Sequence, residues 1–152
     1  MVGQGTGDRG RGTAQGLRIP KPLYDQVVAY CQTAWPHEEA CGYLVANADG
    51  TVSKVYPMRN VERSPLGYAM DPNEQFRVEK ELRANNLKLA GIYHSHTATE
   101  ASPSTVDVAH AISPDVSYVI VSLEDREHPV VKSYRIEGQR VTEEPVRIYT
   151  EG

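Results

Sequence analysis

The segment at residues 87–93 constrains the fold most, because it reads as a buried strand and runs directly into His94-Ser95-His96. Successive side chains of an extended strand point to opposite faces, so His94 and His96 project from the same side. The two imidazoles can then share one metal ion. The pair alone is weak evidence, because histidine also serves as an ordinary surface or core residue.

Extended and helical patterns alternate along the rest of the chain. The turn Asn47-Ala48-Asp49-Gly50 joins two extended segments into a hairpin, and Asp71-Pro72 opens a helix with a capping side chain. The patterns predict strands at 41–46, 51–56, 87–93, 117–123, 130–136 and 140–148, and helices at 22–35, at 72–85 and from 104 onward. This order predicts an α/β (α+β) fold with a mixed β-sheet flanked by helices.

Length and glycine content suggest the domain boundaries. A chain of 152 residues is expected to form one domain, since domains average about 100 to 200 residues. Residues 1–16 hold six of the twelve glycines and almost no large apolar side chains, so they cannot offset the entropy of ordering. We therefore expect a disordered tail at 1–16 and a single domain at 17–152.

Charge and hydropathy exclude several classes of partner. The formal net charge of −4 offers no basic surface for nucleic acid, so no DNA or RNA partner is expected. No apolar run approaches the roughly 18 residues of a membrane span, and the N-terminus lacks the apolar region of a secretory signal. A cytoplasmic protein follows, in which Cys31 and Cys41 stay reduced.

Asp107 is a candidate third ligand, eleven residues beyond His96 on the first turn of the following helix. The polar loop 97–103 is long enough to fold that turn back over the strand end. Two imidazoles and one carboxylate are typical of zinc hydrolases, which leave a fourth position for water. The alternative is a capping box, in which Ser104 caps the helix and Asp107 reaches back as an acceptor. Both roles can hold together.

The complete spacing is His-x-His, seven residues, Ser, two residues and Asp, present as His94-Ser95-His96, residues 97–103 and Ser104-Thr105-Val106-Asp107. It resembles the signature of the JAMM metallopeptidases, also called the MPN-plus or Mov34 family, whose layout is similar to that of cytidine deaminases. The family also carries an upstream glutamate three residues before a glycine, and Glu39-Ala40-Cys41-Gly42 fits that position. The resemblance covers nearly all of residues 17–146.

The resemblance implies a role for each matched position. His94, His96 and Asp107 would hold one Zn²⁺ per chain. Glu39 would act as general base, taking a proton from the attacking water and passing it to the departing amine. Ser104 would hydrogen-bond the oxyanion of the tetrahedral intermediate.

Two further stretches, residues 93–101 and 141–146, closely resemble the actinobacterial enzymes that release cysteine from a small sulfur-carrier protein. The implied partner is a ubiquitin-like carrier that ends in Gly-Gly and is joined to cysteine by an ordinary amide. A tail without side chains can add as a strand to an exposed sheet edge. The segment 63–70, with Gly67 and Tyr68, is the candidate edge and substrate-binding site, although an ordinary connecting loop fits nearly as well.

Two alternatives remain open. The same chemistry could trim residues that follow Gly-Gly and so mature a sulfur carrier for another sulfur-transfer pathway. A non-catalytic scaffold, as in MPN relatives that have lost their metal ligands, would bind no zinc. The complete ligand set argues against the scaffold.

Overall fold

The computed structural model describes residues 16–150 of the chain. The glycine-rich segment 1–16, expected to be a disordered tail, lies outside the described residues except for Gly16. The described elements, in chain order, are β1 (Leu17–Pro20), α1 (Lys21–Ala34), β2 (Cys41–Ala46), β3 (Val52–Met58), α2 (Pro72–Ala84), β4 (Lys88–His96), α3 (Thr105–His110), β5 (Ser117–Ser122), β6 (Val130–Glu137), β7 (Arg140–Glu144) and β8 (Val146–Tyr149).

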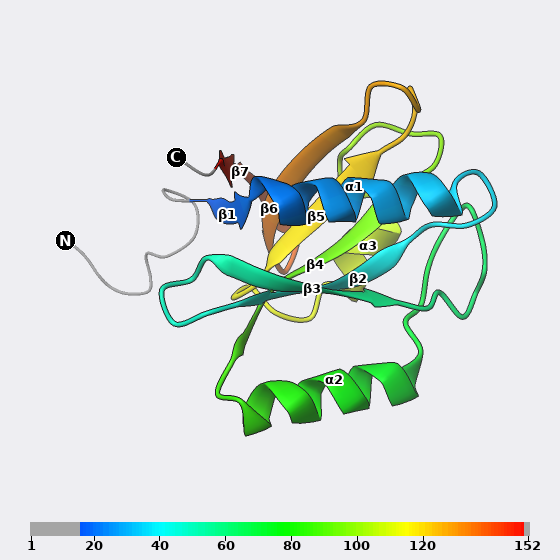
Figure 1. The fold of residues 1–152 in the computed structure, drawn as a ribbon. Coiled ribbons are helices and arrows are strands. Elements are labelled where there is room, and N and C mark those ends of the chain that lie inside the picture. Colours follow the sequence, from blue (N-terminus) through cyan, green and yellow to red (C-terminus); the bar gives the residue numbers. More distant parts are fainter. Residues whose placement is uncertain (1–15, 151–152) are drawn as a thin grey trace.

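A mixed six-stranded sheet forms the centre of the molecule, in the order β3-β2-β4-β5-β6-β7. Strands β4 and β5 run parallel, and every other neighbouring pair in this sheet is antiparallel. Helix α1 lies over one face of the sheet, and α2 lies across the opposite face (Figure 1). The expected α/β (α+β) fold, with a mixed sheet flanked by helices, is confirmed.

The two faces of the sheet carry separate apolar cores, because side chains alternate along each strand. Leu44 of β2 packs with Val27 of α1, whereas its neighbour Val45 packs in the cluster that contains Val78 of α2. A third cluster packs against α3 and shares Ile92 with the second. Helix α1 therefore buries one face of the sheet, and α2 and α3 bury the other.

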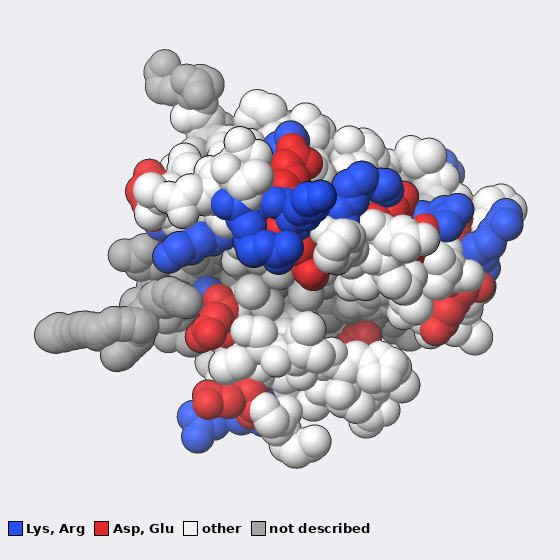
Figure 2. Space-filling view, turned by 90° about the horizontal axis from the view of Figure 1, so that it is seen from below, with Lys and Arg blue, Asp and Glu red and all other residues white. Residues whose placement is uncertain are grey.

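The face seen from the side of α2 carries charges of both signs. Lys and Arg form a band across it, with Asp and Glu among them (Figure 2). Helix α2 has Glu74 in its first turn and Arg83 in its last, an arrangement that complements the helix dipole. Its N-cap is Asp71, whose side chain accepts from the Asn73 N–H, as the capping pattern predicts.

The central strand β4 extends further than the predicted strand at 87–93. It ends at His96, so both histidines belong to the strand and are fixed by its neighbours. His94 pairs with Cys41 of β2 and with Ile120 of β5, and His96 pairs with Ser122. Hydrogen-bonded neighbours therefore hold the His-x-His motif on rigid backbone.

The prediction of a single strand at 140–148 is wrong. The chain leaves the large sheet at Pro145, which has no N–H for a ladder hydrogen bond, and forms β7 and β8 in different sheets. Strand β8 pairs in parallel with β1, a strand that the sequence patterns did not predict. The Leu17 N–H donates to the Pro145 carbonyl at 2.9 Å, which joins the two ends of the domain.

Candidate active site

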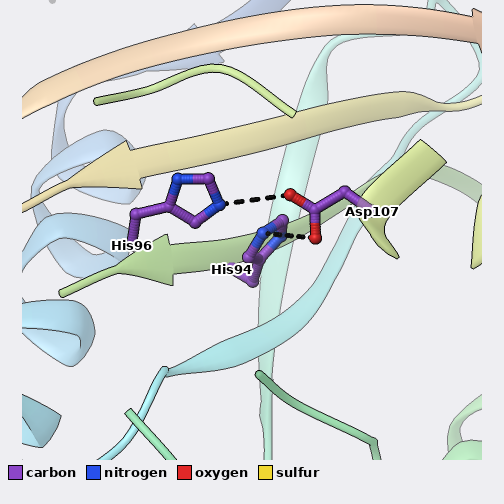
Figure 3. A group of neighbouring side chains, drawn as sticks. All are labelled: His94, His96 and Asp107. Atoms are coloured by element: carbon purple, nitrogen blue, oxygen red, sulfur yellow. Dashed lines mark hydrogen bonds and ion pairs between the residues drawn. The ribbon is translucent and has the colours of Figure 1, made fainter. Parts of the chain in front are cut away.

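The two histidines project from the same face of β4, as strand alternation predicts. Their ring centroids lie 5.0 Å apart, and both side chains are buried. Tyr93, between Ile92 and His94 in the chain, points instead into the core under α1. Figure 3 shows both imidazoles turned toward Asp107.

Asp107 reaches the histidines from the first turn of α3. Its Oδ1 lies 3.3 Å from Nε2 of His94, and its Oδ2 lies 3.1 Å from Nε2 of His96. The capping box is also present: the Ser104 hydroxyl accepts from the Asp107 N–H at 3.0 Å, and the carboxylate accepts from the Ser104 N–H at 2.9 Å. The cap therefore holds the carboxylate where it faces both imidazoles.

This group of three side chains favours a positive charge at its centre. Its potential ligand atoms lie within 4.8 Å of one another. Burial raises the pKa of Asp107, but the adjacent imidazoles of His94 and His96 outweigh it and hold the pKa well below its usual range. Burial lowers the pKa of His96, but Asp107 and the Glu100 carbonyl bring about a net increase. A bound cation would satisfy the same demand with both imidazoles neutral.

The ring nitrogens also suit a metal. Nδ1 of His96 donates to the Glu100 carbonyl at 2.8 Å, so a neutral ring presents the lone pair of Nε2 toward Asp107. Nε2 of His94 is buried, and although Asp107 is near, the geometry makes no hydrogen bond to any described residue. Two imidazole nitrogens and a carboxylate oxygen are donors that zinc accepts. The residues present therefore fit a zinc ion.

Glu39 lies at the end of the loop that precedes β2, and backbone hydrogen bonds fix it there. Its N–H donates to the Ser64 carbonyl at 2.8 Å. The next residue, Ala40, is tied to β4 twice, because its N–H donates to the Ser95 hydroxyl at 2.9 Å and its carbonyl accepts from the Ser95 N–H at 3.0 Å. Ser95, which alternates away from His94 and His96, thus holds the segment that carries Glu39.

The Glu39 carboxylate is buried and is left without a hydrogen-bond donor among residues 16–150. Burial raises the pKa of Glu39 to about 7, an effect that His96 opposes and that the carboxylates of Asp107 and Glu62 reinforce. A carboxyl group with this pKa exchanges a proton readily near neutral pH.

One cavity of about 260 Å³ brings the predicted catalytic residues together with two members of the metal group, His96 and Asp107. Its lining includes Glu39, Pro65, Leu66, Gly67, Tyr68, His96, Thr97, Ala98, Thr99, Ser104 and Asp107. A second cavity, of about 280 Å³, shares Tyr68 and Asp107 with the first and includes apolar side chains such as Ile92. A substrate that reaches the metal group therefore has space on two sides.

Ser104 stands at the same cavity with its hydroxyl proton available. The oxygen accepts from the Asp107 N–H, and among the residues that the structure describes its own proton has no acceptor. Ser104 is exposed. The helix cap thus orients the hydroxyl without using its donor.

The segment 63–70 is not a sheet edge, so that part of the prediction is wrong: the edge strands of the six-stranded sheet are β3 and β7. Residues 60–70, which we name the active-site loop, connect β3 to α2 and are closed by bridges between Asn60 and Met70 and between Ser64 and Gly67. The Tyr68 ring stacks on the His94 imidazole, with centroids 4.7 Å apart. The sequence patterns do not single out Asn60, the first residue of this loop. Its hydrogen-bond partners are backbone groups, which leave no pattern in the sequence.

The fold and the site together define a class of protein. Two histidines on a central strand, a carboxylate from the next helix and a buried glutamate beside them are the arrangement of hydrolases that use three protein ligands for a metal. The chain belongs to the prokaryotic homologs of the JAB domain, since the model of that family matches residues 20–137.

Two proteins of assigned activity are similar to this chain. The CysO-cysteine peptidase of Mycobacterium tuberculosis is 42% identical over 140 residues, which cover 91% of this chain and 94% of that protein. The desampylase of Haloferax volcanii is 32% identical over 119 residues, covering 75% of this chain and 86% of that protein. With a peptidase as a relative over nearly its whole length, the chain is a hydrolase.

A solution structure of a protein from Desulfitobacterium hafniense shares the fold, with a TM-score of 0.79 and 38% identity. The match covers 89% of this chain and 94% of that one. Within residues 16–150, none of the helices is both long enough and apolar enough to cross a membrane.

Proposed function

We propose that this chain is a zinc-dependent peptidase that hydrolyses the amide bond between the C-terminal Gly-Gly of a small ubiquitin-like sulfur-carrier protein and cysteine. It would release cysteine in sulfur-carrier-dependent cysteine biosynthesis in the cytoplasm. The observation that carries the proposal is that His96 and Asp107 of the metal group line one cavity together with Glu39 and Ser104, while His94 completes the group beside them. The similarity to a protein named CysO-cysteine peptidase supports the choice of substrate.

One Zn²⁺ per chain would be held by Nε2 of His94, Nε2 of His96 and the Asp107 carboxylate. When bound, zinc lowers the pKa of a water molecule to about 7 and polarises a carbonyl group. Two of the metal ligands are already oriented without a metal, because the cap on α3 fixes Asp107 and the Glu100 carbonyl fixes the tautomer of His96.

Glu39 is the proposed general base. Its pKa of about 7 keeps a substantial fraction ionised at neutral pH, and a nearby cation would increase that fraction. The ionised carboxylate takes a proton from the attacking water and later delivers it to the departing amine. Since none of the described residues donates to this carboxylate, both of its oxygens stay available for the transfer.

Ser104 is the proposed donor to the oxyanion that forms when water attacks the amide carbonyl. Its hydroxyl proton is free, and its oxygen is fixed by the Asp107 N–H. A donor that is already oriented stabilises developing charge without reorganisation during the reaction.

The carrier tail would approach through the cavity that the active-site loop and residues 97–99 both line. Gly67, Tyr68, Thr97 and Thr99 all line this cavity. A Gly-Gly end has no side chains, so its backbone can enter a narrow passage and reach the metal group. Gly67 and Tyr68 are therefore our proposed substrate contacts.

Intact mass spectrometry tests the proposal directly. The carrier–cysteine adduct is incubated with the zinc-loaded enzyme, with the Glu39→Gln variant and with enzyme treated with a chelator. We expect only the first reaction to lower the carrier mass by one cysteine residue. If the wild-type protein leaves the mass unchanged, the substrate assignment fails.

A second candidate keeps the site and changes the leaving group. A peptidase that processes the C-terminus of a sulfur carrier for another pathway would use the same residues, and the similarity to a desampylase supports cleavage of other carrier adducts. Carriers extended by other residues after Gly-Gly, assayed in parallel, decide between the two by their kcat/KM values.

The less favoured alternative is a non-catalytic scaffold. It predicts a zinc stoichiometry near zero that added zinc does not restore, and metal analysis after gentle purification tests this. The fit of His94, His96 and Asp107 to zinc argues against it.

A further inference from the structure

Asn60 is a buried polar side chain just beyond β3 that no step of the proposed mechanism uses. Only 3% of its surface is exposed. Its amide nitrogen Nδ2 donates to the Glu39 carbonyl and to the Gly67 carbonyl, each at 3.0 Å. Its oxygen Oδ1 accepts from the Glu62 N–H at 3.0 Å and from the Ala69 N–H at 3.1 Å.

These four hydrogen bonds use the whole capacity of the Asn60 side chain, two donors and two acceptor lone pairs. All four partners are backbone groups, so their donor and acceptor roles are fixed. The reverse orientation of the amide would place its NH₂ group against two N–H donors and its oxygen against two carbonyls. The carboxamide therefore has one orientation here.

The position of these partners links Asn60 to the proposed chemistry. Glu39 is held by the active-site loop on both sides of its Cα, since its N–H donates to Ser64 and its carbonyl accepts from Asn60. The same amide holds Gly67 and Ala69, the two neighbours of Tyr68 in the chain. One side chain thus fixes the backbone of the proposed base relative to the loop that stacks on His94.

We propose that Asn60 is a positioning residue, which sets the distance between Glu39 and the part of the active-site loop that contacts the substrate. The expected change in kcat rests on the proposed function, whereas the structural role of Asn60 rests on its hydrogen bonds alone. A base displaced by about 1 Å can lose about 100-fold in rate. A residue that only stabilised the fold would leave kcat of the folded protein unchanged.

The Asn60→Asp variant separates the two halves of the amide. It keeps an acceptor for Glu62 and Ala69 but replaces the donor with an oxygen that faces the carbonyls of Glu39 and Gly67. Ser133→Ala is the matched control, because it also removes a buried hydrogen bond, from the Ser133 hydroxyl to Glu144 at 2.7 Å, in a different part of the sheet.

The experiment uses the full-length, zinc-loaded protein and the carrier–cysteine adduct. We expect Asn60→Asp to lower kcat by about 10- to 100-fold with the zinc content unchanged, while Ser133→Ala, at a similar loss of thermal stability, keeps the wild-type kcat. A kcat of Asn60→Asp within twofold of the wild type would overturn the proposal. If Asn60→Asp does not fold, Asn60→Ser, which keeps a small polar group, replaces it with the same criteria.

Hydrogen exchange tests the positioning role of Asn60 independently of whether the proposed function is correct. If the wild-type protein does not cleave the adduct, the proposed function fails, but positioning is still measured by the exchange of the Glu39 amide, which is bonded to Ser64. We expect faster exchange of this amide in Asn60→Asp and not in Ser133→Ala. Exchange at the wild-type rate would show that Asn60 does not hold Glu39.

Discussion

Two buried carboxylates lie at opposite ends of the parallel strands β4 and β5, and they differ in the hydrogen-bond donors that surround them. At the start of β5, Glu144 is 2% exposed and accepts from the hydroxyls of Ser117 and Ser133 at 2.6 and 2.7 Å. It also pairs with Nε of Arg135 at 3.1 Å. At the other end, beside the last residues of β4, the Glu39 carboxylate accepts from none of the described residues.

The difference separates a structural site from a reactive one. A buried polar group without a partner costs about 1–3 kcal/mol, so the complete network at Glu144 favours the folded state. Burial of the Glu39 carboxylate, which lacks a hydrogen-bond donor, is unfavourable for folding until a cation and a substrate enter the site. Substitution of Glu39 itself should therefore remove activity and spare stability, and substitution of Glu144 should do the reverse.

The largest effect is expected for Glu39→Gln. The amide cannot accept a proton from water, so kcat should fall by about 100- to 10,000-fold, while the zinc content stays the same. Steady-state kinetics and metal analysis measure both. Glu38→Gln is the control, because Glu38 lines a different surface hollow with Arg59 and Arg63. Comparable losses in both variants would contradict a specific role for Glu39.

Ser104→Ala should follow, because it removes the proposed donor to the oxyanion. Loss of one such donor lowers kcat by about 100- to 1,000-fold, and loss of the N-cap of α3 should lower the free energy of unfolding by about 1 kcal/mol. Ser104→Thr retains a hydroxyl that can serve both roles and should recover most of each. A destabilised Ser104→Ala variant with the wild-type kcat would leave only the capping role.

Glu144→Gln tests the other side of the comparison. It leaves Arg135 without its buried carboxylate, and the free energy of unfolding should fall by about 1–3 kcal/mol. The kcat/KM value below the unfolding temperature should not change. The exposed neighbour Glu143 provides the control Glu143→Gln, for which denaturation curves should match the wild type. A loss of activity in folded Glu144→Gln would show that the two ends are coupled.

The pKa of Glu39 gives the comparison a dependence on pH. Burial raises the pKa of Glu39 to about 7 in the folded, metal-free protein, whereas the unfolded chain has the ordinary glutamate value. The folded state then holds a proton that the unfolded state has lost. The contribution of Glu39 to the free energy of unfolding is therefore complete below the ordinary glutamate pKa, and it is lost as the pH rises through about 7.

Denaturation with a chelator present, at several pH values, measures this effect. The free energy of unfolding of the wild-type protein should decline across that interval relative to that of Glu39→Gln, because glutamine does not titrate. Above pH 7 the metal-free variant should be the more stable protein. Parallel pH curves for the two proteins would show that the Glu39 carboxyl keeps an ordinary pKa.

The sequence predicted those parts of the site in which the direction of each side chain depends only on neighbouring residues in the chain. His94 and His96 share a face because a strand alternates, and Ser104 and Asp107 meet because a capping box spans only four residues. Fold class followed for the same reason, from alternating periodicities. Each of these inferences needs only residues that are close together in the chain.

The parts that could not be predicted depend on partners far apart in the chain. Asn60 binds the carbonyl of Glu39, and Ser117 donates to Glu144, across 21 and 27 residues respectively. The pairing of β1 with β8 joins opposite ends of the described chain. Pro65 and Gly67 favoured an edge strand, but the hydrogen bonds of Asn60 fold this segment into a loop instead.

The smallest effect is expected for Gly67→Ala, at the open side of the reactive end. Gly67 does not have a positive φ, and a Cβ there would meet only Oε1 of Glu62, at 3.3 Å, the end of a flexible side chain. Stability should therefore change little. The added methyl narrows the passage proposed for the Gly-Gly tail, so KM for the carrier–cysteine adduct should rise about tenfold, with kcat nearly unchanged.

A short peptide that ends in Gly-Gly-Cys distinguishes the tail from the body of the carrier in this test. Since the methyl group would obstruct the Gly-Gly backbone itself, KM should rise by the same factor for the peptide and for the intact adduct. A rise for the intact adduct alone would mean that Gly67 contacts the folded part of the carrier. Unchanged KM values for both substrates would place the tail elsewhere, with the apolar second cavity beside Ile92 as the remaining route to the metal group.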